Sequence, residues 1–207
     1  MLAGNLWFPI MVGIGGVLFF VTPMVAQLYG ARNLKEIGPL ARQAIWLSIP
    51  IVLFGMFVLS QASWILTLAK VDPDIIFYSE EYLSYFIFAL PAILLSQPLR
   101  SLCEGVTKPL PITLLNILML LIAIVANYTF IYGNFGFPEM GARGAGLSAI
   151  IGTWTSFIIL IVYLRFKSAY GTEFFSKFEF PDFKILLEIL RGGIPVGLGN
   201  FIELSMF

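Results

Sequence analysis

Long apolar runs separated by short charged stretches organise this sequence. Positions free of Asp, Glu, Lys and Arg form five runs, over residues 1–31, 43–69, 82–99, 109–138 and 144–164. A helix needs about 20 mainly apolar residues to cross the roughly 30 Å hydrocarbon core of a bilayer, so each run can form one crossing. Helices are expected because an open sheet would leave backbone N–H and C=O groups unpaired in lipid. The pattern therefore predicts an all-α integral membrane protein.

The predicted helices lie near Asn5–Leu28, Gln43–Leu66, Tyr82–Gln97, Ile112–Tyr132 and Gly144–Leu164. The third is the shortest, and we expect it to continue past Pro98 toward Glu104. A further apolar stretch begins near Gly192 and extends to Phe207. The expected fold is a polytopic helix bundle with five full spans and the start of a sixth.

Composition supports a lipid environment and excludes several kinds of chemistry. Of the 207 residues, 59% are apolar and 12% charged, and the mean hydropathy is +0.93. Ordinary soluble domains have roughly 25% charged residues. The 12 basic and 12 acidic residues cancel, which gives no support for a nucleic-acid partner. With no histidine and Cys103 as the single cysteine, neither a metal cluster nor a nucleophile–base pair is expected. We therefore predict no enzymatic activity, no catalytic residues, no cofactor and no metal, with the lipid bilayer as a partner.

The distribution of lysine and arginine predicts the orientation of the spans. Loops 29–42, 98–111 and 165–191 contain ten of the twelve basic residues, and the alternating loops contain only Lys70 and Arg143. The positive-inside rule therefore places these three loops in the cytoplasm. Trp46 then lies near the inner end of its helix, as in an aromatic belt. The expected location is the plasma membrane, as a multi-pass protein.

The two ends of the chain are unusual in this topology. Met1 lies outside with no preceding helix to carry it across, and the last helix is unfinished at Phe207. We expect an excerpt from a longer polytopic protein or a truncated gene product. The alternative is a complete protein of five and a half spans.

Two polar residues within the apolar spans are candidates for function. Glu203 is the only acidic side chain inside an apolar span, twelve residues beyond Arg191 at the cytoplasmic edge. At ~1.5 Å per residue it lies about 18 Å deep. A charge there costs roughly 2.5–3.5 kcal/mol, so such residues usually mark an ion or substrate pathway. The alternative is a protonated Glu203 bonded to a neighbouring helix. Asn127, in the outer half of its helix, is suited either to bind a cation or to bond another helix.

Other features predict packing and local structure. The spacing Gly144-x3-Ser148-x3-Gly152 puts three small residues on one helical face, where two backbones can approach closely. Kinks are expected at Pro9, Pro23, Pro50, Pro91 and Pro195, where the freed carbonyls either line a cavity or serve no special role. Arg100 and Glu104, four residues apart, are expected to form a local ion pair.

Four segments carry a resemblance to a known family. The first is Thr22-Pro23-Met24-Val25-Ala26-Gln27-Leu28-Tyr29-Gly30-Ala31, and the second is Leu99-Arg100-Ser101-Leu102-Cys103-Glu104-Gly105 followed by Lys108-Pro109. The third runs from Asn127 to Gly133 and continues with Gly136, Pro138, Gly141 and Gly144. The fourth is Gly193-x-Pro195 with Glu203 and Phe207. In this order they resemble the multidrug and toxic compound extrusion (MATE) family of cation-coupled antiporters.

The resemblance implies an architecture and roles for the two candidate residues. Family members have twelve helices in two six-helix lobes, so residues 1–190 correspond to an incomplete N-terminal lobe that lacks its first helix. Residues 191–207 correspond to the beginning of the first helix of the second lobe, which is otherwise missing. Glu203 matches an acidic residue assigned to cation coupling, and Asn127 matches a position in the substrate and cation cavity. Ala123 stands where the family often has a second Asn.

The implied activity is multidrug efflux by antiport against Na⁺ or H⁺ through alternating access, in a bacterial inner membrane. The implied substrates are small, often cationic, organic compounds, and the chain alone is expected to be inactive. One alternative is a lipid-linked saccharide flippase of the same superfamily, but its cavity needs several basic residues and the predicted spans contain none. The other is a non-transporting membrane scaffold from a truncated gene.

Overall fold

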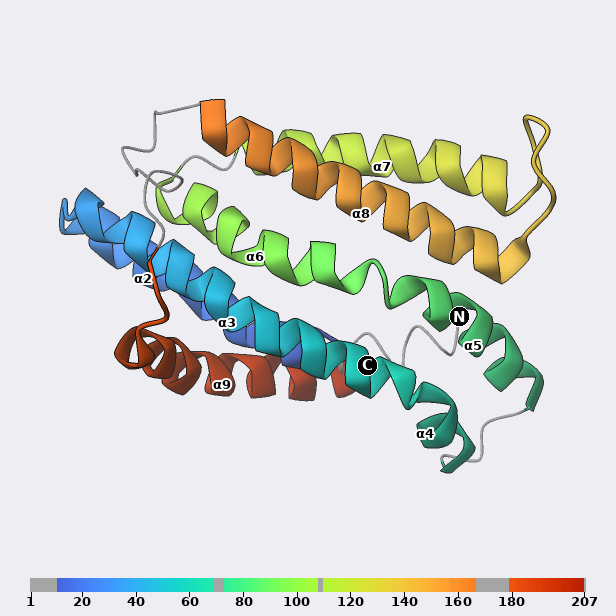
Figure 1. Cartoon of the computed structure of the whole chain (residues 1–207), viewed down its shortest axis with the longest axis horizontal. Coiled ribbons are helices and arrows are strands. Elements are labelled where there is room, and N and C mark those ends of the chain that lie inside the picture. Colours follow the sequence, from blue (N-terminus) through green and yellow to red (C-terminus); the bar gives the residue numbers. More distant parts are fainter. Residues whose placement is uncertain (1–10, 69–72, 108–109, 167–178, 207) are drawn as a thin grey trace.

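The structure is a computed structural model that describes residues 11–68, 73–107, 110–166 and 179–206. Helices make up most of these residues (Figure 1). In chain order they are η1 (Val17–Phe20), α2 (Val21–Gly30), α3 (Leu34–Ser60), α4 (Ala62–Leu68), α5 (Pro73–Phe86), α6 (Leu90–Gly105), α7 (Leu110–Phe130), α8 (Gly141–Phe166) and α9 (Phe183–Ser205).

The described helices include five that are long and apolar enough to cross a membrane and one bent pair that can form a sixth crossing. The five are Met11–Gly30, which we call the first span, Leu34–Ser60, Ile112–Phe130, Gly141–Phe166 and Phe183–Ser205. Large apolar side chains such as Leu114, Leu120 and Val125 of α7 are exposed on the outside of the bundle, as expected for a surface in contact with lipid. The prediction of an all-α polytopic membrane protein is confirmed.

Two helices begin earlier than their apolar runs predicted. Helix α3 starts at Leu34 rather than near Gln43, so Lys35 and Arg42 belong to a helix and not to a loop. Helix α9 starts at Phe183 rather than near Gly192, after Asp182, whose side chain accepts a hydrogen bond from the Lys184 N–H. In both cases the charged residues occupy the N-terminal part of the helix, because helix formation does not require an apolar environment. Lys70, Lys108, Lys167 and Lys177, which contributed to the predicted orientation, lie outside the described residues.

The third predicted span is broken. Helix segments Ser79–Phe86 and Leu90–Gly105 meet at an angle of 52°. Pro91 explains the position of the break, since it has no N–H to donate and its ring would collide with the carbonyl of residue 87 in a continuous helix. The Trp154 indole N–H of α8 donates to the Phe88 carbonyl at the break, at 2.9 Å. As predicted, the inner part continues past Pro98, to Gly105.

Helix α6 lies at the centre of the bundle. It packs against α2 and α3 on one side and against α8 on the other, while α7 pairs with α8 at one edge and α9 packs on η1 and α3 at the opposite edge (Figure 1). Fully buried apolar side chains from several helices fill the interior, including Leu18, Ile37, Leu90, Leu99, Leu102, Leu160 and Ile189.

The small residues of α8 act in packing, as the sequence predicted. A Cβ at Gly144 would meet the backbone of Phe130 at the end of α7, and one at Gly146 would meet Tyr85 of α5. Ser148 is buried and donates its hydroxyl to the Gly144 carbonyl at 2.9 Å. At Gly144 this face therefore brings α8 close to α7, whereas a Cβ at Gly152 would meet only Met119 Cγ, at 3.8 Å.

Candidate functional site

Asn127 lies near the C-terminal end of α7, half-buried on the face of the helix that includes Asn116, Met119 and Ala123. These positions differ by three, four and four residues, the spacing that puts side chains on one helical face. Toward the N-terminal end of this face, Asn116 Oδ1 accepts a hydrogen bond from the Arg100 guanidinium of α6, at 2.9 Å. The face with Asn127 therefore contacts α6 through Asn116.

The chain that follows Asn127 forms a closed turn. The Asn134 side-chain amide donates to the carbonyl of Tyr128 at 3.1 Å, and the Tyr128 and Phe135 rings meet edge-on with centroids 6.1 Å apart. These contacts hold the end of α7 and fix the orientation of the helix turn that carries Asn127.

Glu203 lies in the last turn of α9 with its side chain exposed. Helix α9 is at the opposite edge of the bundle from α7 (Figure 1). The structure therefore places the two predicted site residues on separate helices, and it does not bring them together into one local cluster. In the described part of the chain, no group of three or more His, Cys, Asp or Glu side chains could hold a metal ion.

A glycine seam joins α9 to the first span. We use this name for Gly13 and Gly16 of the first span together with Gly193 and Gly197 of α9. A Cβ at Gly16 would lie 2.8 Å from Gly197 Cα, and a Cβ at Gly197 would lie 2.6 Å from the Gly13 carbonyl oxygen. A Cβ at Gly193 would collide with the Val17 carbonyl. The two backbones can approach this closely because Gly16, Gly193 and Gly197 lack side chains, while Gly13 packs against the Phe201 side chain.

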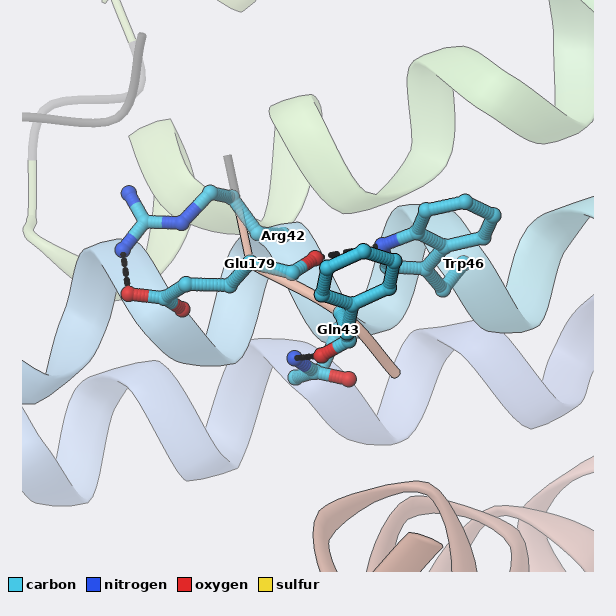
Figure 2. Close-up of polar contacts among 5 residues, drawn as sticks. Arg42, Gln43, Trp46 and Glu179 are labelled. Atoms are coloured by element: carbon cyan, nitrogen blue, oxygen red, sulfur yellow. Dashed lines mark hydrogen bonds and ion pairs between the residues drawn. The ribbon is translucent and has the colours of Figure 1, made fainter. Parts of the chain in front are cut away.

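The segment before α9 is bound to α3, as Figure 2 shows. We call residues 179–182 the lead-in segment. Gln43, which is 2% exposed, donates to the Phe180 carbonyl at 2.9 Å and accepts from the Asp182 N–H at 2.7 Å. The Trp46 indole donates to the Glu179 carbonyl at 2.9 Å, and the Arg42 guanidinium pairs with the Glu179 carboxylate at 2.7 Å.

These bonds fix the start of α9 beside α3. They connect residues more than 130 positions apart in the chain. Trp46, expected as part of an aromatic belt at the inner membrane face, has in addition a specific hydrogen-bond partner in the lead-in segment.

The predicted ion pair between Arg100 and Glu104 is not formed. The Arg100 guanidinium bonds to Asn116 of α7 instead, while Glu104 is exposed. A same-helix pair at this spacing is worth only about 0.2–0.5 kcal/mol, so a partner on a neighbouring helix can replace it. The two described ion pairs join different elements, Arg42 with Glu179 and Arg143 with Glu81.

The sequence did not predict that the first span packs on α9, nor that the lead-in segment binds α3. The glycine pair of α9 had a recognisable signal, because Gly193-x3-Gly197 has the spacing of a close helix contact. Gln43 and Trp46 had no such signal, since nothing in their local sequence identifies a partner beyond the next helices.

Comparison with known proteins gives a consistent result. The MatE family model matches residues 1–129. A probable multidrug resistance protein NorM of Shewanella oneidensis is 33% identical over 98% of this chain, which corresponds to 44% of that protein. The multidrug resistance protein MdtK of Klebsiella pneumoniae is 32% identical over 98% of this chain and 45% of its own length.

Solved structures show the same fold. The eukaryotic MATE transporter AtDTX14 matches 99% of this chain with a TM-score of 0.85 at 19% identity, over 45% of its own length. The MATE transporter NorM-NG, solved in complex with a monobody, matches with a TM-score of 0.63 at 25% identity, over 46% of its length. This chain thus spans less than half the length of the relatives that it matches.

Proposed function

This chain belongs to the MatE family, and from that premise we propose that it is the larger part of one lobe of a multidrug efflux antiporter. The transporter exports small organic compounds, often cations, in exchange for Na⁺ or H⁺. It resides in a bacterial inner membrane, with loops 29–42, 98–111 and 165–191 in the cytoplasm. Its activity is transport and not catalysis.

One observation carries this proposal. The similarity to relatives named multidrug resistance proteins extends over 98% of the chain, so it includes every described helix and the candidate residues Asn127 and Glu203. The α-helical bundle supports the same function, because its spans and outward apolar faces suit a protein that works within the bilayer.

In this proposal the two candidate residues have different roles. Glu203 binds the coupling cation, since a carboxylate within a span is costly unless it holds a proton, a cation or another partner. Asn127 lines the cavity in which the substrate or cation is held, on the face of α7 that includes Asn116. Their separation in this structure suits residues that act at different points of a transport cycle.

We further propose how the lobes are arranged. Residues 1–190 form the first lobe without its first helix, and residues 191–207 begin the second lobe, so the boundary falls within the continuous helix α9. Alternating access requires two lobes that move relative to each other. The 207 residues alone are therefore inactive in transport.

The test is dye export by the complete gene product in proteoliposomes with an imposed Na⁺ or H⁺ gradient. Glu203→Gln is expected to abolish gradient-driven export, because the amide can no longer exchange a cation. Glu188→Gln is the matched control, because Glu188 is an exposed carboxylate of the same helix at its inner end, and it is expected to retain export.

Two outcomes would contradict the proposal. Undiminished coupling in Glu203→Gln would remove Glu203 from the mechanism. Gradient-driven export by the isolated 207-residue chain would show that the second lobe is not needed.

A further inference from the structure

A cavity of about 280 Å³ lies between residues 92–100 of α6 and the middle of α7 and α8. The cavity is separate from Asn127, which does not line it. Asn127 lies eight residues, about 12 Å, along α7 from Met119, the residue of α7 that does line the cavity. The polar side chains in its wall are Ser96, Gln97, Arg100, Thr153 and Ser156.

The charge of this cavity is unusual for a transporter of cations. Arg100 is its charged lining residue, and the lining contains no carboxylate. One N–H of the guanidinium donates to Asn116, whereas a guanidinium has five N–H donors in all. The remaining donors are available to a ligand, and their positive charge disfavours an organic cation at this position.

The hydroxyl groups of the wall are not equivalent. Ser96 donates to the Ile93 carbonyl at 2.7 Å and Thr153 donates to the Ala149 carbonyl at 2.7 Å, so both donors are used within their own helices. Ser156 is 4% exposed, and its Oγ has no hydrogen-bond partner among the described residues. Buried hydroxyls are nearly always hydrogen-bonded in folded proteins, so the Ser156 hydroxyl is free to donate to a group bound in the cavity.

We propose that this cavity binds a phosphate group through Arg100, Gln97 and Ser156. Three side chains from two helices offer donors to one small volume, which matches a phosphate better than a carboxylate, because phosphate has more acceptor oxygens. Arg100 lies five residues before the end of α6, about 8 Å from the inner end of the helix. At that depth the phosphate can belong to an anionic lipid of the inner leaflet or to a free anion from the cytoplasm.

The site does not depend on the proposed transport function, and its test measures binding only. The 207-residue chain is purified in neutral detergent and examined by native mass spectrometry with equal amounts of phosphatidylglycerol and phosphatidylcholine. In a second arm, its thermal unfolding is measured with inorganic phosphate and with sodium chloride at the same ionic strength. Preferential retention of phosphatidylglycerol identifies a lipid ligand, and stabilisation by phosphate identifies a free anion; either result supports the site.

Substitutions then assign the binding to these side chains. Arg100→Met is expected to weaken binding of the preferred ligand about tenfold, because it removes a charged hydrogen bond. Ser156→Ala is expected to weaken it about threefold, because it removes a neutral one. Without ligand, Ser156→Ala is expected to leave the Tm unchanged or raise it, because it removes an unpaired hydroxyl. Arg100→Lys keeps the charge and is expected to restore part of the binding.

Matched controls separate the site from general charge and packing. Arg165 is an exposed cation at the same membrane end, in the last turn of α8, and Ser148 is a buried serine of α8 already bonded to Gly144. Arg165→Met and Ser148→Ala are expected to bind as the unchanged chain does. The proposal is overturned if phosphatidylglycerol and phosphate each bind Arg100→Met and Ser156→Ala as well as they bind the unchanged chain. It is also overturned if Arg165→Met loses as much binding as Arg100→Met.

Discussion

The contact between α7 and α8 depends on the absence of a side chain at Gly144. A Cβ at this position would lie 2.6 Å from the carbonyl carbon of Phe130, which is backbone and cannot turn away. We expect Gly144→Ala to lower the free energy of unfolding by about 1–3 kcal/mol, because one of the helices must shift. Reversible unfolding of the chain in detergent measures this change.

Gly152 supplies the matched control from the same motif. A Cβ there would lie 3.8 Å from Met119 Cγ, an ordinary contact with a flexible side chain. Because alanine is a better helix former than glycine by about 1 kcal/mol, Gly152→Ala should be neutral or slightly stabilising. Equal losses in both variants would show that the close approach at Gly144 has no special importance.

Residue patterns identified these packing positions but not all of their partners. The spacing of Gly144, Ser148 and Gly152 predicts a close helix contact because helical periodicity is local information. The partner of Arg100 was predicted wrongly, since a spacing rule considers only the same helix and Asn116 lies on the next one. The roles of Asn127 and Glu203 remain predictions, because neither side chain takes part in a local cluster that would define its chemistry.

At the scale of elements, the attachment of the lead-in segment to α3 depends most on Gln43. Both functional groups of its side-chain amide bond to backbone of the segment, and the residue is buried. Gln43→Ala removes both bonds, at about 1 kcal/mol each. We expect the Asp182 amide hydrogen to exchange at least about tenfold faster with deuterium in this variant.

Gln61→Ala is the matched control for the lead-in segment. Gln61 is exposed, at the end of α3, and its side-chain amide donates only weakly to Ser60, at 3.4 Å. Exchange at Asp182 should be unchanged in this variant. Unchanged exchange in Gln43→Ala as well would mean that other contacts hold the segment.

The break between α5 and α6 gives a second prediction for an element. Trp154 donates to the Phe88 carbonyl, one of the groups that the interrupted helix leaves without an intrahelical partner. Trp154→Phe keeps an aromatic ring but removes the donor, and an unpaired carbonyl in lipid is costly. We expect a loss of about 1–3 kcal/mol in the free energy of unfolding. Trp64→Phe, at an exposed indole of α4, should change it little, and equal effects would contradict the role of Trp154.

The positions of the spans could be predicted from charge-free runs, because hydrocarbon thickness limits where charged residues can lie. The ends of the helices could not, since α3 and α9 continue into regions where Lys35 and Lys184 are exposed to solvent. The attachment of Glu179 and Asp182 to α3 could not be predicted from the sequence either. It joins parts of the chain that are brought together only by the packing of several intervening helices.

At the scale of the whole molecule, the glycine seam fixes the position of α9 relative to the other helices. Helix α9 packs on the first span through Gly193 and Gly197 and is held at its N-terminal end by the lead-in segment. In the proposed transporter this helix begins the second lobe. Movement of the lobes must then either open the seam or carry α9 along with the first lobe.

A disulfide across the seam distinguishes these two possibilities. A Cβ at Gly13 would lie 3.1 Å from the Cβ of Phe201, so a disulfide with its typical Cβ–Cβ distance of ~3.8 Å needs the two helices to separate slightly. We expect Gly13→Cys with Phe201→Cys, in a background where Cys103 is replaced by Ala, to cross-link under oxidising conditions. If the seam opens during transport, oxidation of the complete gene product stops dye export in proteoliposomes and a reductant restores it.

The control cross-link lies within the first lobe. A Cβ at Gly55 of α3 would lie 3.9 Å from Leu90 Cγ of α6, so Gly55→Cys with Leu90→Cys joins two helices that stay together in either case. Export should survive oxidation of this pair, which separates the effect of the seam from damage by the oxidant. Full export with the Gly13–Phe201 disulfide formed would contradict opening at the seam. The boundary of the moving lobe would then lie beyond Phe201, and not at the contact with the first span.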